Sequence, residues 1–143
     1  MEAGIVGDDT DGHIDDTTRF VNEDTVVACV EENSGDDNYE VLQQNLAELK
    51  QMRLLSGKQL NVIELPMPAA IEIDGFRAPG SYANFLICNA GVIVPVFRNP
   101  NDQKAVDILE GAFPGRKVIP LPADDIIWGQ GSFHCLSQQE PEI

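Results

Sequence analysis

The sequence predicts an α/β fold in which one strand–strand–helix–strand arrangement occurs twice, over residues 18–66 and 82–122. In each copy, two strand-like runs separated by a turn precede a stretch with helical spacing of apolar residues, and an apolar strand closes the copy. The closing strands also look alike, with Val62–Pro66 beside Val118–Pro122. Because a module of this kind cannot bury both of its faces alone, we expect the two copies to pack side by side.

The first copy begins with two strands, Arg19–Val21 and Thr25–Val30, joined by a polar turn. A helix follows, with Asp36 or Asp37 as the expected N-cap. Its apolar face is formed by Leu42, Leu46, Leu49 and Met52. Leu60–Leu65 is predicted to be the closing strand.

The second copy repeats this order. Strands are expected over Ala83–Cys88 and Val92–Phe97, with a tight turn between them. The helix is expected to start within Asn99–Asp102 and to end at Pro114, and Arg116–Leu121 closes the copy. The apolar face of this helix is Ala105, Ile108, Leu109 and Ala112.

The segment between the two copies predicts an inserted hairpin. Ala70–Ile73 alternates as a strand does, and Asp74-Gly75 is a two-residue turn signal. A loop over one face is the alternative.

Composition limits the function classes. The 143 residues include 24 acidic and 9 basic side chains, which gives a formal net charge of -15. That charge repels nucleic acid and anionic lipid and attracts a small cation, although it also simply favours solubility. The longest apolar run, Val92–Phe97, is too short to span a membrane, and no leader is visible, so we expect a cytoplasmic protein.

The three cysteines differ in their surroundings. Cys29 and Cys88 lie in apolar, strand-like runs and are expected in the core. Cys135 lies in the polar, glycine-containing segment Trp128–Gln138. No CxxC pair is present, so neither a disulfide framework nor a zinc ribbon is expected. A single thiol in such a loop, with histidine elsewhere, is the pattern of a cysteine nucleophile.

An acidic segment near the amino terminus, Gly7–Asp16, carries five carboxylates around His13. A calcium-binding EF-hand loop does not fit, because Gly7 and Thr18 would occupy positions that require carboxylates. If the segment is extended, His13 and Asp15 face the same side and suit proton transfer beside a bound cation. A solvated acidic turn is the alternative.

Three motifs together resemble the agmatine deiminases of the bacterial-type peptidylarginine deiminase family. They are Gly7–Asp16, Tyr82–Phe85 and His134–Gln138. The resemblance implies a pentein fold, an α/β propeller of five ββαβ modules around a central active site. Family members are more than twice this length, so residues 1–143 are expected to be the incomplete C-terminal part of a single catalytic domain, with two modules.

The resemblance also implies the chemistry, which uses neither a metal nor another cofactor. Cys135 corresponds to the nucleophile that forms an amidino-thioether, and His13 to the general acid and base. Asp15 corresponds to the carboxylate that holds guanidinium nitrogens, and Asp9 is expected to help hold the distal ammonium of agmatine. The expected reaction converts agmatine to N-carbamoylputrescine and ammonia, in polyamine and putrescine biosynthesis. Hydrolysis of arginine, free or in peptides, is the close alternative.

Further expectations concern His134, the behaviour of the chain alone and a function of another class. His134 would point away from Cys135 on an extended strand and is expected to be structural. The chain alone is expected to have little or no activity and to self-associate through open module ends. From another class, a metal-binding or acidic interaction module could use His13, Asp15, His134 and Cys135 as ligands.

Overall fold

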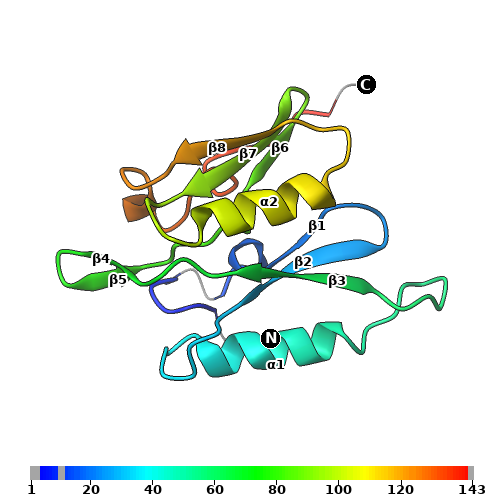
Figure 1. Cartoon of the computed structure of the whole chain (residues 1–143), viewed down its shortest axis with the longest axis horizontal. Helices are drawn as coiled ribbons and strands as arrows, with labels where there is room; N and C mark the ends of the chain where they lie inside the picture. The colour runs from blue at the N-terminus through cyan, green and yellow to red at the C-terminus, as the bar shows by residue number, and fades with distance from the viewer. Residues whose placement is uncertain (1–3, 10–11, 142–143) are drawn as a thin grey trace.

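A computed structural model describes residues 4–9 and 12–141 and contains two separate three-stranded sheets (Figure 1). The first sheet comprises β1 (Thr18–Phe20), β2 (Thr25–Val30) and β3 (Asn61–Pro66). β1 pairs with β2 in antiparallel orientation, and β2 pairs with β3 in parallel. The crossover between β2 and β3 carries α1 (Tyr39–Leu49), as a parallel connection requires.

The second sheet repeats this topology. β6 (Leu86–Cys88) pairs antiparallel with β7 (Gly91–Val96), which pairs in parallel with β8 (Val118–Pro122). α2 (Asp102–Ala112) occupies the crossover between β7 and β8. The predicted order of strand, strand, helix and strand is therefore present in both halves of the chain.

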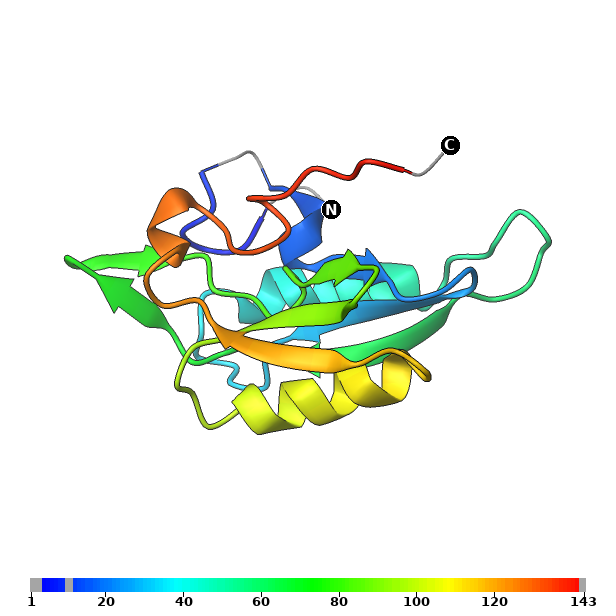
Figure 2. The same ribbon diagram turned by 90° about the horizontal axis from the view of Figure 1, so that it is seen from above.

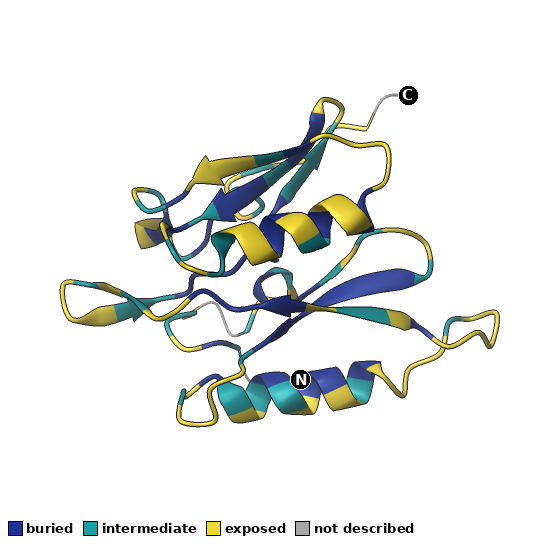
Figure 3. Ribbon diagram, viewed as in Figure 1, coloured by how far each residue is buried: buried dark blue, intermediate teal, exposed yellow. Residues whose placement is uncertain are grey.

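Helix α2 joins the two sheets, because it contacts β3 of the first and β8 of the second (Figure 1). The larger apolar core accordingly contains residues from both halves, among them Leu65 of β3, Val94 of β7 and Leu109 of α2. A smaller cluster fills the space between α1 and the first sheet. The central strands β2 and β7 carry most of the buried strand positions (Figure 3), as expected for strands that have neighbours on both sides.

The inserted hairpin is present between the two halves. It consists of β4 (Ile71–Ile73) and β5 (Phe76–Ala78), paired antiparallel. Asp74 and Gly75 both have positive φ, at 51° and 82°, which is the backbone that a two-residue hairpin turn with right-handed twist requires.

Four local predictions were wrong. Cys88 is half-buried and not in the core, unlike Cys29. Ala83–Phe85 is not part of a strand, because its carbonyl groups bond to a side chain from β1 instead of to a neighbouring strand. The N-cap of α1 is Asn38, and Asp36 instead accepts a hydrogen bond from the Asn38 backbone N–H. Met52 lies beyond the end of α1 and is about half exposed.

Two short 3-10 helices complete the structure, η1 (Ile14–Asp16) and η2 (Ile127–Gly129). Figure 2 shows both of them, with the C-terminal segment, on the opposite side of the sheets from α2. Within the described residues, neither α-helix is long and apolar enough to cross a membrane.

Candidate active site

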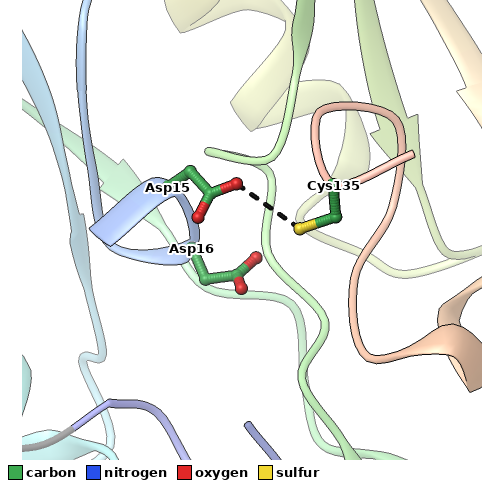
Figure 4. A group of neighbouring side chains, drawn as sticks. All are labelled: Asp15, Asp16 and Cys135. Carbon is green, nitrogen blue, oxygen red and sulfur yellow. Dashed lines mark hydrogen bonds between the residues drawn. The ribbon is translucent and has the colours of Figure 1, made fainter. Parts of the chain in front are cut away.

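The candidate site lies where the two ends of the described chain meet (Figure 4). Asp15 and Asp16 belong to η1, just before the first sheet, and Cys135 lies in a turn that follows η2. The Cys135 sulfur is 3.4 Å from Asp15 Oδ2. The structure thus brings together two of the three residues expected to perform catalysis.

Asn84 is fully buried and connects η1 with the turn that carries Cys135. Its Oδ1 accepts hydrogen bonds from the backbone N–H groups of Ser132, His134 and Cys135, at 3.0, 3.0 and 3.3 Å. Its Nδ2 donates to Asp16 Oδ1 at 2.9 Å and lies 3.0 Å from the Cys135 sulfur. One amide therefore fixes the turn that carries Cys135 and ties it to the carboxylates of η1.

Arg19 of β1 holds the segment that carries Asn84. Its Nη1 donates to the carbonyl oxygens of Ala83 and Phe85, at 3.2 and 3.0 Å, and its guanidinium lies 4.6 Å from the Phe85 ring centroid. These bonds replace the strand pairing predicted for Ala83–Phe85, and they hold Asn84 from both sides.

Gly131 lets the chain turn back closely onto Cys135. A Cβ atom at this position would lie 2.6 Å from Cys135 Cβ and closer still to its sulfur. Real Cβ atoms do not approach other atoms so closely, and only glycine fits here.

Burial and like charge decide the protonation states. Burial, with the charges of Asp16 and Asp15, raises the pKa of the Cys135 thiol to about 11. Burial and the Asp15 charge raise the pKa of Asp16 to about 7. Among the described residues, Asp16 Oδ2 has no hydrogen-bond partner, which adds to the cost of its charged form. Without a ligand, the site therefore holds a neutral thiol beside excess negative charge.

Asp15 is the carboxylate that remains ionised. Burial opposes its charge, yet hydrogen bonds from His134 and Cys135 and the charge of His134 hold its pKa below the usual value. A charged Asp15 beside Cys135 is suited to bind a planar cation whose N–H groups face the carboxylate.

The expected orientation of His134 was wrong. Its ring faces Asp15, with Nδ1 at 2.6 Å from Oδ2, instead of pointing away from the site. Side chains alternate only in extended strands, whereas residues 133–136 form a turn, so His134 and Cys135 reach the same carboxylate.

His13 and Asp9 have exposed positions in the amino-terminal loop. The extended conformation expected across His13–Asp15 is replaced by η1, because Thr17 N–H bonds back to the carbonyl of Ile14. In the described part of the chain, no hydrogen bond joins the imidazole of His13 to Cys135. With its amide nitrogen toward the loop, Gln130 reaches Asp9 Oδ1 at 3.3 Å, which places Asp9 beside the segment of Cys135.

Among the described residues, one group of side chains could hold a metal ion. Ligand atoms of Asp15, Asp16 and Cys135 all lie within 4.8 Å of one another. Neither histidine of the predicted metal-ligand set belongs to this group. Thr10 and Asp11 of the acidic segment lie outside the described residues.

Comparison with known proteins identifies the family. Residues 1–141 match the Porphyromonas-type peptidyl-arginine deiminases. Agmatine deiminase of Stutzerimonas stutzeri is 35% identical over 96% of this chain, and that of Ectopseudomonas mendocina is 33% identical over 99%. This chain is a member of the Porphyromonas-type peptidyl-arginine deiminase family.

Solved structures of the family agree with the fold. A crystal structure from Porphyromonas gingivalis superposes with a TM-score of 0.95 at 38% identity, over 99% of this chain and 42% of that one. An agmatine deiminase variant of C. jejuni with substrate bound gives a TM-score of 0.84 at 34% identity, over 93% of this chain and 38% of that one. The deiminase family fold, a pentein, is thus present here as two ββαβ modules, and the chain spans 42% of the length of the S. stutzeri relative.

The sequence alone assigns no role to four residues of this candidate site. Asp16 was only one acid of a cluster, Arg19 was only a strand residue, and Asn84 was only part of a motif. The glycines of Trp128–Gln138 predict a sharp turn or a close backbone approach to a ligand, but not the close contact of Gly131 with Cys135. A polar residue between aromatic ones, as Asn84 is in Tyr82–Phe85, was the one available signal that this segment leaves a regular strand.

Proposed function

We propose that this chain carries the nucleophile and a guanidinium-binding carboxylate of an agmatine-hydrolysing site. The observation that supports this most directly is the 3.4 Å contact between Cys135 Sγ and Asp15 Oδ2. A guanidinium held by Asp15 lies within reach of the sulfur, as covalent catalysis at its carbon requires.

The proposed reaction has two half-reactions. The Cys135 thiolate attacks the guanidinium carbon, and ammonia leaves with a proton supplied by His13, which gives an amidino-thioether. Water then gives one proton to His13 and attacks the same carbon. The carbon–sulfur bond breaks to release the thiolate, and the remaining hydroxyl proton passes to the solvent or the released ammonia as the carbonyl group of N-carbamoylputrescine forms. His13 acts first as acid and then as base, a pair of roles that an imidazole side chain can fill.

The pKa of Cys135 favours a cationic substrate. Burial, together with the nearby negative charge, holds the thiol protonated, so a bound guanidinium that offsets this charge lowers the pKa of the thiol. The attacking thiolate then forms chiefly when the cation is present.

Charge also supports agmatine over arginine. His134 and Arg19 both act on these carboxylates, and both are engaged: His134 Nδ1 lies 2.6 Å from Asp15 Oδ2, and Arg19 Nη1 donates to two carbonyl groups. Neither is left for the α-carboxylate of arginine, whereas Asp9 is available for the distal ammonium of agmatine. A cytoplasmic role in putrescine formation follows from this substrate.

A matched pair of reagents tests the proposal on the chain itself. 2-Chloroacetamidine is a cation that resembles guanidinium, and 2-chloroacetamide is its neutral analogue. We expect the ratio of the amidine rate to the amide rate to be about tenfold higher at Cys135 than at the half-buried Cys88, because Asp15 Oδ2 lies 3.4 Å from the Cys135 sulfur and concentrates the cation there. Site-resolved mass spectrometry gives both rates, and agmatine should protect Cys135. Equal preference at the two thiols would overturn the proposal.

The cluster of Asp15, Asp16 and Cys135 supports metal binding as a second candidate function. Chelation separates the two. If hydrolysis by the thiol is the function, treatment with EDTA leaves the amidine preference of Cys135 unchanged. A metal site would instead show stoichiometric Zn²⁺ binding that blocks Cys135 and is reversed by EDTA.

A further inference from the structure

The shortest contact in the candidate site joins His134 to Asp15. Nδ1 of His134 lies 2.6 Å from Asp15 Oδ2, although the two residues are 119 positions apart. The side chains are 28% and 14% exposed, so water competes only weakly for this bond. A contact this short between an imidazole and an ionised carboxylate is a charge-assisted hydrogen bond in which Nδ1–H donates.

The backbone of His134 is itself fixed from two directions. Its N–H donates to Asn84 Oδ1 at 3.0 Å, and its carbonyl accepts from the Ser137 hydroxyl at 2.8 Å. The ring therefore projects from an anchored turn. Asp15 belongs to the single 3-10 turn η1.

The three side-chain contacts that the described residues make with Asp15 all reach Oδ2. Besides His134, they are the sulfur of Cys135 at 3.4 Å and Asn84 Nδ2 at 3.4 Å. None of these side-chain contacts engages Oδ1, and the neighbouring residues His134 and Cys135 hold the carboxylate and the nucleophile in one arrangement.

We infer that His134 is a positioning residue, whose Nδ1–H orients the Asp15 carboxylate so that it presents a guanidinium or amidinium cation to Cys135. This inference rests on the proposed function, because it assigns to Asp15 the binding of that cation. In this role, His134 neither contacts the reacting carbon nor transfers a proton to the substrate.

Two substitutions at one position test the geometry. In His134→Asn, the amide nitrogen occupies the place of Nδ1, whereas in His134→Gln it overlies Nε2. We expect H134N to keep the amidine preference of Cys135 within about threefold and H134Q to lose about tenfold of it. The loss should appear in the concentration of 2-chloroacetamidine that gives half-maximal rate. The limiting rate and the rate with 2-chloroacetamide should change less than about twofold, since the thiol stays in place.

The outcomes are distinguishable. If the unsubstituted chain shows no amidine preference, the proposed function fails. If it does and H134Q keeps that preference, or H134N and H134Q lose it equally, the role of His134 is overturned. Should H134Q fail to fold, nitrogen-detected NMR of the unsubstituted chain decides: a proton on Nδ1 of His134 is expected, and a neutral ring protonated only at Nε2 would contradict the inference.

Discussion

Cys135 Sγ lies 3.4 Å from Asp15 Oδ2, although 120 positions separate the two residues in the chain. Asp15 precedes the first module and Cys135 follows the second, so the contact forms only when both modules have folded and packed through α2. Reactivity at Cys135 therefore reports on the whole arrangement and not on a local motif.

Replacing Gly131 by alanine tests the close approach to Cys135. The new methyl group overlaps the Cys135 side chain, so the turn must move, at a cost of about 1–3 kcal/mol. We expect Gly131→Ala to lower the free energy of unfolding by this amount and to abolish the amidine preference of Cys135. Urea unfolding and mass spectrometry measure the two effects.

Gly129 provides the matched control two residues earlier. A Cβ atom there meets nothing within 4 Å, so Gly129→Ala should change the free energy of unfolding by less than about 0.5 kcal/mol and leave the labelling of Cys135 intact. Equal changes in unfolding free energy and in Cys135 labelling in the two variants would show that the contact with Cys135 does not require glycine at position 131.

Local patterns predicted the modules well, because the periodicity of buried residues depends only on which side of an element faces the core. Thr25–Val30 and the Asp74-Gly75 turn are in the structure as expected. The strand predicted over Ala83–Phe85 was wrong because its apolar residues are buried without strand pairing. Arg19 of β1 bonds to the carbonyl groups of Ala83 and Phe85 instead. The bond of His134 to Asp15 likewise depends on tertiary packing. The prediction assumed an extended strand at His134 and therefore placed its ring on the side away from Cys135.

Asp15→Asn should change two alkylation rates in opposite directions. Removing the charge lowers the pKa of Cys135, although burial still raises it, so 2-chloroacetamide reacts faster at pH 8. The amidine preference is lost at the same time, because the carboxylate that attracts the cation is gone. Asp107→Asn on α2 removes the same charge away from the site and should change neither rate. A parallel fall of both rates in D15N would indicate a collapsed site.

We predict little or no turnover of agmatine by this chain alone. It spans 42% of the length of the S. stutzeri agmatine deiminase, and a guanidinium has more N–H groups than Asp15 can satisfy. Ammonia release from agmatine, compared with the Cys135→Ser variant, measures this directly. Turnover with Cys135-dependent kinetics would contradict the prediction and show that these two modules suffice.

Self-association is the expected state in solution. Ile14, Phe20, Trp128 and Leu136 are each 58–65% exposed, and such apolar surface favours contact with another chain. Ile14 and Leu136 adjoin Asp15 and Cys135, so the surface includes the rim of the site. Sedimentation velocity should show oligomers that increase with concentration, and a monodisperse monomer at all concentrations would contradict this.

Asp16 should make the chain less stable as the pH rises. Its pKa is about 7 in the folded chain, chiefly through burial, against about 4 when unfolded. Between these values the folded state holds a proton that the unfolded state has lost, so the stabilisation from Asp16 is complete below about pH 4 and is lost as the pH rises toward 7.

Asp16→Asn keeps the shape and the bond from Asn84 but cannot titrate. The free energy of unfolding of the unsubstituted chain, minus that of D16N, should therefore fall by up to about 1.4 kcal/mol per pH unit over this window. Groups common to both proteins cancel in the difference, so parallel pH curves would show that Asp16 is not held neutral by its burial.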